Sequence, residues 1–304
     1  MFNQGLIFAM LSAFMFSIMN VMVKELSITM PTGEIVFVRS LIGVIIILLI
    51  MKSCQIKFSN QDIPMLFFRG IVGGTSMLLL FIALSGMKLG DVAILQDLSA
   101  FFVLLISIFY LKEKLPLKTI PPIIIIILGT CFILRPWEYD SFSIYALFAI
   151  FSAFLAAVAY TTIHKLFAHG GHNSWEIVFY FLFCSMIIGF IFMYDNYRLP
   201  NNYELILLIG IGITSLLAQT FMTQAYGLAN QVLVSFIMYL GVFLNVLWGY
   251  VFFNEIMHTL SIIGGIFIIG GSFCLTLLKN KQNKLKKTNL HLISLLFLQN
   301  PDNQ

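Results

Sequence analysis

The chain has 304 residues, and 60% of them are hydrophobic while only 10% are charged. Its mean hydropathy is +0.98, and its formal net charge is +4. A soluble globular domain carries about 25% charged residues, so this composition excludes a soluble fold and indicates a membrane protein.

Ten apolar ranges follow one another along the chain, and each is long enough to cross a bilayer as an α-helix, which takes about 20 residues. The sequence therefore predicts an all-α integral membrane protein with ten transmembrane helices. The ranges, in chain order, are 5–25, 34–52, 65–86, 91–111, 117–135, 143–164, 175–194, 204–226, 231–252 and 259–279.

The first five ranges resemble the last five at a fixed spacing. Moved forward by 142 positions, Ala83 meets Ala225, and the residues from Glu34 to Phe37 recur from Glu176 to Phe179. Collinear matches of this kind indicate a duplicated unit. Further pairs at the same spacing are Leu98 and Leu240, Phe101 and Phe243, Glu113 and Glu255, Ile120 and Ile262, and Gly129 and Gly271.

Each copy of the unit contains five predicted helices. Because five is an odd number, the second copy enters the membrane from the opposite side, which gives the inverted repeat found in many secondary transporters. We predict a first five-helix repeat over residues 1–136, a second over 143–279 and a basic cytoplasmic tail over 280–304, with 135–142 as the hinge between the halves.

Lysines and arginines are distributed unequally over the predicted loops. With a cytoplasmic N-terminus, the outer side receives only Lys24, Lys88, Arg135 and Arg198. This asymmetry satisfies the positive-inside rule, so we expect the protein in the cell (inner) membrane with both termini cytoplasmic. The inner basic residues are Lys52, Lys57, Lys112, Lys114, Lys118, Lys165, Lys279, Lys281, Lys284, Lys286 and Lys287.

Asp97 is the acidic residue that lies well inside a predicted helix. A charge there costs at least about 2.5–3.5 kcal/mol on insertion scales, so such a residue usually faces a polar cavity or a partner. Asp97 could bind a substrate amine or carry a coupling proton. The alternative is a structural ion pair with Arg39, since both residues are expected in the outer half of the membrane.

Two arginines, Arg39 and Arg69, lie within about two turns of a predicted helix end. Their fixed, multi-donor guanidinium groups could bind a carboxylate or phosphate of a substrate. Alternatively, both side chains extend along the helix to the membrane interface, as long basic side chains commonly do.

Neutral polar and aromatic residues are also candidates for a cavity wall, because small-molecule sites combine aromatic surfaces with a few polar groups. The alternative for each is a hydrogen bond between helices. In range 231–252, Tyr239 lies one repeat shift from Asp97, so we expect the Tyr239, Phe243 and Leu247 stripe to face the cavity. The candidates are Asn20, Gln96, Tyr160, Gln219, Tyr239, Asn245 and Trp248.

Other charged and polar residues are expected outside such a site. Glu113 and Glu255 lie at helix ends, where we expect interfacial, gating or folding roles. His164, His169 and His172 are close in sequence, and we favour a solvated loop over a metal site. The sequence contains no HExxH motif and no paired intramembrane aspartates, so we predict no enzyme, no cofactor and no metal.

Several of these features together resemble the EamA-type drug/metabolite transporters. They are the two five-helix repeats, the residues from Glu34 to Arg39 that open the second helix, Arg69 at the start of the third, and Glu113 and Glu255 that close the fourth and ninth. The resemblance covers about residues 5–279. It implies a central cavity among the first, third, fourth, sixth, eighth and ninth helices.

The resemblance implies a secondary transporter that moves a small polar metabolite by alternating access. The arginines of the second and third helices are similar to those of bacterial S-adenosylmethionine and amino-acid carriers of this superfamily, which implies a substrate of that kind. A drug or toxic-metabolite exporter of the same fold is the alternative.

The small multidrug members of the superfamily have a glutamate in the middle of their first helix, where this chain has Asn20 and, in the second repeat, Tyr160. This difference argues against exchange of protons for lipophilic cations. The expected partners are a small-molecule substrate and the lipid bilayer, with no nucleic acid, and a homodimer is left open.

Overall fold

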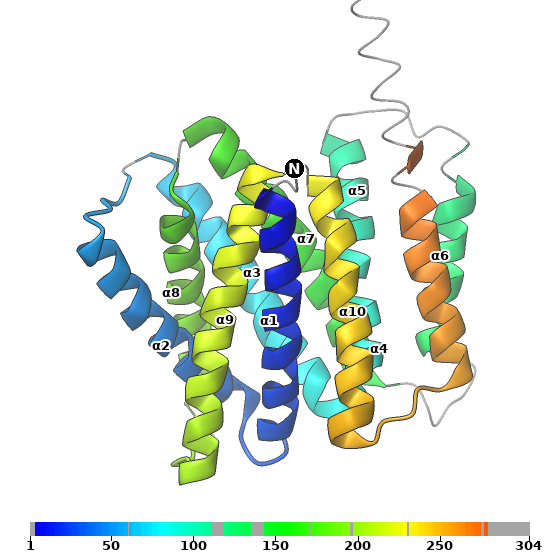
Figure 1. Ribbon diagram of the computed structural model, residues 1–304, viewed down its shortest axis with the longest axis horizontal. Helices are drawn as coiled ribbons and strands as arrows, with labels where there is room; N and C mark the ends of the chain where they lie inside the picture. The colour runs from blue at the N-terminus through cyan, green and yellow to red at the C-terminus, as the bar shows by residue number, and fades with distance from the viewer. Residues whose placement is uncertain are drawn as a thin grey trace, which may run out of the picture.

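The computed structural model describes residues 4–59, 61–110, 118, 120–134, 143–170, 172–194, 197–229, 231–274 and 277–278. Over these residues the chain is helical and contains no β-strand. The helices stand side by side in one bundle (Figure 1). Glu113, the expected hinge 135–142 and the expected tail 280–304 lie outside the described residues.

A helix occupies each of the ten expected ranges, which confirms the all-helical fold. Six of the helices, α1, α2, α3, α7, α8 and α9, are long and apolar enough to cross a membrane. The bounds are α1 Gln4–Leu26, α2 Thr32–Ser53, α3 Ile63–Gly86, α4 Leu89–Gln96, α5 Leu98–Tyr110, α6 Ile120–Leu134, α7 Ile144–Gly170, α8 Ser174–Met193, α9 Asn202–Leu228 and α10 Gln231–Phe253, followed by a helix over Thr259–Cys274.

The fourth range differs from the prediction, because it forms two helices with Asp97 between them. The N–H group of Asp97 still donates to the carbonyl of Ala93, as in an α-helix, but the N–H of Ala100 donates to the carbonyl of Asp97, three residues back, at 3.1 Å. The helix therefore tightens locally toward a 3₁₀ turn, and such turns within a helix often mark a functional hinge.

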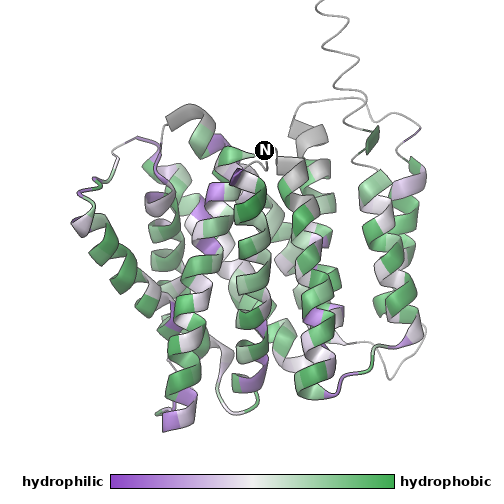
Figure 2. Cartoon of the chain, viewed as in Figure 1, coloured by the Kyte–Doolittle hydropathy of each residue, from purple (hydrophilic) through white to green (hydrophobic). Residues whose placement is uncertain are grey.

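The surface of the bundle is apolar along most of its height. Large hydrophobic side chains such as Ile45, Phe151, Ile191 and Phe243 are exposed, and polar residues gather mainly near the ends of the helices (Figure 2). A soluble protein rarely exposes contiguous apolar surface of this extent. This surface is suited to contact with lipid.

The packing of the helices follows the sequence repeat, which matches α1, α2, α3 and the pair α4 and α5 with α7, α8, α9 and α10. Helix α1 packs on α9, and its counterpart α7 packs on α3. Likewise α3 packs on α8 as α9 packs on α2, and α1 packs on α10 as α7 packs on α4 and α5. Exchanging the two halves therefore reproduces the main helix contacts.

Hydrogen bonds between helices repeat in the same way. The hydroxyl of Ser12 in α1 donates to the carbonyl of Ala218 in α9 at 2.9 Å. The sequence Ser-Ala-Phe that begins at Ser12 recurs at Ser152, 140 positions later. The hydroxyl of Ser152 donates to the carbonyl of Ser76 in α3 at 2.7 Å. Both hydroxyls are thus satisfied by the facing backbone, as polar groups in lipid must be.

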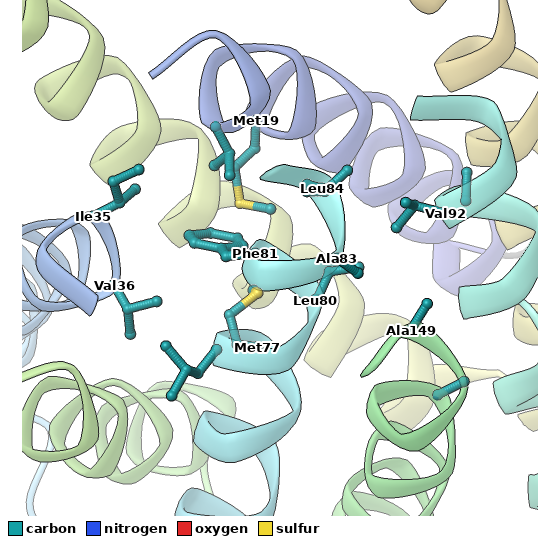
Figure 3. Packing of buried hydrophobic residues seen from close by; sticks show 14 of the residues in the cluster. Met19, Ile35, Val36, Met77, Leu80, Phe81, Ala83, Leu84, Val92 and Ala149 are labelled. Carbon is teal, nitrogen blue, oxygen red and sulfur yellow. The ribbon is translucent and has the colours of Figure 1, made fainter. Parts of the chain in front are cut away.

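The core lies around α3, where Met77, Leu80, Phe81 and Leu84 meet side chains from α1, α2, α4 and α7 (Figure 3). Glycines bring some helices closer still. A Cβ atom added to Gly189 of α8 would lie 2.6 Å from the backbone nitrogen of Phe37 in α2. Such close approach is common between membrane helices that carry small residues.

Candidate functional site

A cavity of about 120 Å³ lies inside the bundle. Its walls come from α1, α3, α4, α5, α7, α9 and α10, which are the helices that the family resemblance predicts, and Phe181 of α8 also contributes. Many of its lining residues are small or apolar, and these include Ala13, Gly73, Met77, Leu80, Ala93, Ala156, Ala159, Met238, Gly241 and Val242.

Apart from Asn245, which is described with α10 below, the structure brings six of the predicted site residues together at this cavity and leaves three outside its lining. Those that line it come from α1, α3, the α4–α5 junction, α7 and α9. The six are Asn20, Arg69, Gln96, Asp97, Tyr160 and Gln219, and the three outside are Arg39, Tyr239 and Trp248.

Asp97 reaches the cavity because it occupies the break between α4 and α5. The alternative role, an ion pair with Arg39, is not formed. Instead, the Oδ2 atom of Asp97 and the Oε1 atom of the neighbouring Gln96 are buried without a hydrogen-bond partner among the described residues. Buried polar atoms normally have a partner, so these two acceptors are candidates for binding a ligand.

Arg69 is buried in the protein and only 1% exposed, so the alternative in which it extends to the membrane interface is wrong. Its guanidinium carbon lies 4.4 Å from the centre of the Phe181 ring, and its Nη2 atom donates to Oε1 of Gln219 at 3.5 Å. Its Nε and Nη1 atoms have no hydrogen-bond partner in the described part of the chain.

The head group of Arg69 lies over Gly73, one turn further along α3. A Cβ atom added to Gly73 would lie 2.4 Å from Nη1 of Arg69. This glycine therefore makes room for the guanidinium against the helix, which is a role that its sequence context did not indicate.

Arg39 is fully buried as well, so it too does not extend to the interface. Its Nη1 atom donates to the hydroxyl of Ser215, and its guanidinium carbon lies 5.3 Å from the ring centre of Phe81 and 5.7 Å from that of Phe181. Phe181 thus contacts both arginines. The repeat spacing could have revealed its position, because Phe181 corresponds to Arg39.

The expected orientation of α10 is wrong. Phe243 and Leu247, which share the predicted stripe with Tyr239, are 66% and 40% exposed on the outside of the bundle. Asn245 lines the cavity instead. The repeat shift itself holds on this face, because Gln96, Ser99 and Ala100 correspond to Met238, Gly241 and Val242, and all six residues line the cavity. The error arose in continuing from Tyr239 by steps of four, since the lining face of α10 passes through Met238, Gly241, Val242 and Asn245.

The two other candidates on α10 have separate contacts. Trp248 donates from Nε1 to the hydroxyl of Ser17 in α1 at 3.2 Å. This contact is the hydrogen bond between helices that the sequence offered as the alternative to a place in the cavity wall. Tyr239 packs against the hydrophobic core. Asn245, by contrast, accepts a hydrogen bond at 3.2 Å from Nδ2 of Asn20 at the cavity wall.

An aromatic pair forms part of the wall. The rings of Tyr160 and Tyr226 are stacked with their centres 5.3 Å apart and their planes inclined by 24°, and both line the cavity. Tyr226 was not among the predicted site residues. Its position five residues before α10, at the end of a polar stretch of α9, was the available signal.

Glu255 lies at a helix end, as predicted, and joins three segments at one end of the bundle. Its carboxylate pairs with Lys24 at the end of α1, at 2.7 Å, and accepts the N–H of Leu89 at the start of α4, also at 2.7 Å. Beside it, Nζ of Lys88 donates to the carbonyl of Ile256 at 2.6 Å. We call these five residues the Glu255 cluster, which consists of Lys24, Lys88, Leu89, Glu255 and Ile256.

His172 is buried, so the prediction that it lies in a solvated loop is wrong. Its Nδ1 atom lies 3.0 Å from Oε2 of Glu176, the fourth residue after it, whose other oxygen accepts the N–H of Ser59 at 2.7 Å. In the part of the chain that the structure describes, no three histidine, cysteine or acidic side chains form a group that could hold a metal ion.

An apolar helical bundle with unpaired polar atoms facing an internal cavity is typical of membrane transporters. The sequence profile of the EamA-like transporter family matches residues 3–135 and again residues 143–277. The chain therefore belongs to the EamA-like transporter family and contains two EamA domains, as the resemblance predicts.

Relatives across the length of the chain are transporters by name. The chain is 36% identical over 281 residues to the pseudopaline exporter CntI of Pseudomonas aeruginosa, covering 92% of this chain and 98% of that protein. It is 25% identical over 266 residues to the riboflavin transporter of Vibrio cholerae, covering 83% and 85% respectively. A crystal structure with 15% sequence identity has the same fold, with a TM-score of 0.64 over 90% of this chain and 98% of its own.

Proposed function

We propose that this protein is a secondary transporter that exports a small polar metabolite across the cell (inner) membrane. The observation that carries this proposal is the internal cavity, where Arg69, Gln96 and Asp97 present atoms without partners among the described residues. Buried charges inside an apolar bundle are costly unless they serve a ligand or an ion. The outward direction is supported by the 36% identity to a protein named as an exporter.

The proposed architecture is ten transmembrane helices in two inverted repeats, with α4 and α5 together forming the fourth crossing. Two observations support it. The main helix contacts are reproduced when the two halves are exchanged, and the Ser12 and Ser152 hydrogen bonds recur between corresponding helices. A pseudo-two-fold axis in the membrane plane would produce both features.

The proposed orientation has both termini in the cytoplasm. The start of α1 and the end of the last described long helix, Thr259–Cys274, lie at the same end of the bundle (Figure 1). Lys52 belongs to the last turn of α2, and Lys165 lies five residues before the end of α7. Both helices run toward this end of the bundle (Figure 1). The positive-inside rule favours this end as the cytoplasmic one.

Transport by alternating access requires that the cavity open to each face in turn. In the structure, the Glu255 cluster joins α1, α4 and the segment after α10 at the proposed outer face. We propose that this cluster closes the outer face and that its ion pair breaks when the two halves rock apart to release the substrate.

The experiment is an uptake assay in inside-out membrane vesicles, in which an exporter moves its substrate into the lumen. Vesicles with and without the protein are incubated with a small-molecule extract of the cells that make it, and the lumenal contents are compared by mass spectrometry. We expect one or a few polar metabolites to accumulate only with the protein. No difference between the two vesicle types would overturn the proposal.

The same vesicles test the alternative of a drug exporter. Lipophilic cationic dyes are added in place of the extract, and their accumulation is followed by fluorescence. We expect equal accumulation with and without the protein, because a lipophilic cation would leave the buried guanidinium of Arg69 without an anionic partner. Dye uptake without metabolite uptake would favour the alternative.

A further inference from the structure

The unpartnered polar atoms of the cavity fall into two chemically different sets. The donor set consists of Nε and Nη1 of Arg69. The acceptor set consists of Asn20 Oδ1, Gln96 Oε1 and Asp97 Oδ2. None of these five atoms has a hydrogen-bond partner among the described residues, although all four side chains line one cavity.

The donor set is rigidly held and positively charged. Phe181 lies against the face of the Arg69 guanidinium, Gln219 contacts Nη2, and Gly73 leaves space beneath Nη1. Arg39 lies on the same Phe181 ring and adds a second positive charge nearby. Neither arginine forms an ion pair with a described carboxylate, so an anion is the missing partner, and a carboxylate fits a guanidinium fork.

A chain of hydrogen bonds fixes the orientation of the acceptor set. The backbone carbonyl of Gly241 can only accept, so the atom of Asn245 that lies 2.7 Å from it is Nδ2. The Oδ1 atom of Asn245 then accepts from Nδ2 of Asn20. Asn20 must therefore present Oδ1, which joins the oxygen atoms of Gln96 and Asp97 as a third acceptor.

Three acceptors, one of them a carboxylate, match a protonated amine, which has only donors. The two sets share one cavity but form no ion pair with each other. Tyr160 lines the same cavity as both sets. A ligand with one charge would leave one set without a partner. The free-energy cost would be large, because a buried unpaired charge is strongly destabilising.

We infer that the substrate is an amphoteric metabolite, bound with a carboxylate at Arg69 and a protonated amine at Asn20, Gln96 and Asp97. This inference rests on the proposed function and specifies its substrate class. It also assigns an orientation, because the amine end of the metabolite lies at the α4–α5 break and its carboxylate end lies against Phe181 of α8.

The test uses purified full-length protein in detergent and measures the shift of its Tm with charge-matched probes. The probes are the ω-amino acids from glycine to aminohexanoate, with hexanoate and hexylamine as compounds that carry one group each. We expect at least one ω-amino acid to raise Tm by roughly 2–4 °C at a concentration about tenfold above its Kd, while hexanoate and hexylamine have no effect at that concentration.

Variants assign the two ends of the ligand. In the wild-type protein, the ω-amino acid should raise Tm more than hexanoate or hexylamine does, and we call this difference its advantage. Arg69→Gln and Asp97→Asn should each abolish this advantage. Arg198→Gln and Asp62→Asn make the same chemical changes at exposed positions outside the cavity and should retain the advantage. The inference is overturned if no ω-amino acid exceeds both hexanoate and hexylamine, or if the advantage persists in both cavity variants.

The vesicle experiment separates this inference from the proposed function. If a metabolite accumulates in vesicles but carries only one of the two groups, the protein is an exporter of another substrate class, and the inference fails alone. If no metabolite accumulates, the proposed function itself fails.

Discussion

Gly73 is a single residue whose lack of a side chain shapes the cavity. Gly73→Ala would place a Cβ atom 2.4 Å from Nη1 of Arg69, so the guanidinium must leave its position. We expect metabolite uptake into vesicles to fall about tenfold or more, because a charge-assisted hydrogen bond is worth about 1.5–3 kcal/mol. The matched control is Gly270→Ala, whose added Cβ meets nothing within 4 Å; an equal loss in both variants would refute the role of Gly73.

Asp97 allows a separation of function from folding at one residue. Asp97→Asn keeps the size of the side chain but removes its charge, and the charge has no partner among the described residues that folding would lose. We therefore expect transport to fall about tenfold or more, while the yield of folded protein stays within about twofold. Quantitative immunoblotting beside the uptake assay measures both, and a parallel loss of yield and transport would return Asp97 to a structural role.

Asn245 is predicted to affect transport, although the sequence-based expectation directed the stripe of Tyr239, Phe243 and Leu247 toward the cavity. It lines the cavity and fixes the orientation of Asn20, so Asn245→Ala should weaken substrate binding about tenfold, the loss of roughly 1.4 kcal/mol. The half-saturating concentration in the uptake assay measures this effect. An unchanged half-saturating concentration with a lowered Tm would contradict it.

At the scale of elements, the Glu255 cluster connects the end of α1 to the start of α4. Glu255→Gln and Lys24→Gln each remove the ion pair, whose side chains are only 13% and 14% exposed. Each should lower Tm, and the double variant should lower it by no more than either single one, since coupled residues are not additive. The coupling expected is about 1 kcal/mol, and additive effects would show that the pair does not connect the helices.

The helices show where sequence reasoning is reliable and where it is not. The ranges of the long helices follow from predominantly apolar stretches long enough to cross a bilayer, such as 34–52 and 204–226, because lipid requires every backbone group to be bonded within its helix. The break at Asp97 was not predicted, since its flanking residues continue the helical pattern. The direction of α10 was wrong for a different reason. The repeat shift carried the lining positions Gln96, Ser99 and Ala100 correctly onto α10, but the stripe drawn from Tyr239 by steps of four left the lining face at Phe243.

The cavity residues divide in a comparable way. Asp97, Gln96 and Arg69 could be predicted from sequence because polar groups within apolar helices are costly and therefore informative. Phe181 and Gly73 could not be predicted as site residues. In a membrane helix, a phenylalanine or a glycine that packs the core cannot be distinguished by sequence from one that positions a guanidinium. Only their contacts with Arg69 reveal the difference.

At the scale of the whole molecule, the proposed topology places Lys88 and Lys118 on opposite faces of the membrane. A single cysteine at either position reports the face directly. The native cysteines are first replaced by serine or alanine, and these are Cys54, Cys131, Cys184 and Cys274. We expect an impermeant thiol reagent to label position 88 from outside intact cells and position 118 only after the membrane is opened. Labelling of both positions from the same side would refute the inverted repeat.

The central claim is that one cavity opens alternately to the two faces, and a cysteine on its wall tests this most directly. Ala156 lines the cavity on α7 without belonging to either polar set, so Ala156→Cys reports access and leaves the polar groups intact. An impermeant thiol reagent should label this cysteine in right-side-out vesicles and in inside-out vesicles, and the exported metabolite should slow both reactions. Labelling from one face only, with or without the metabolite, would contradict alternating access.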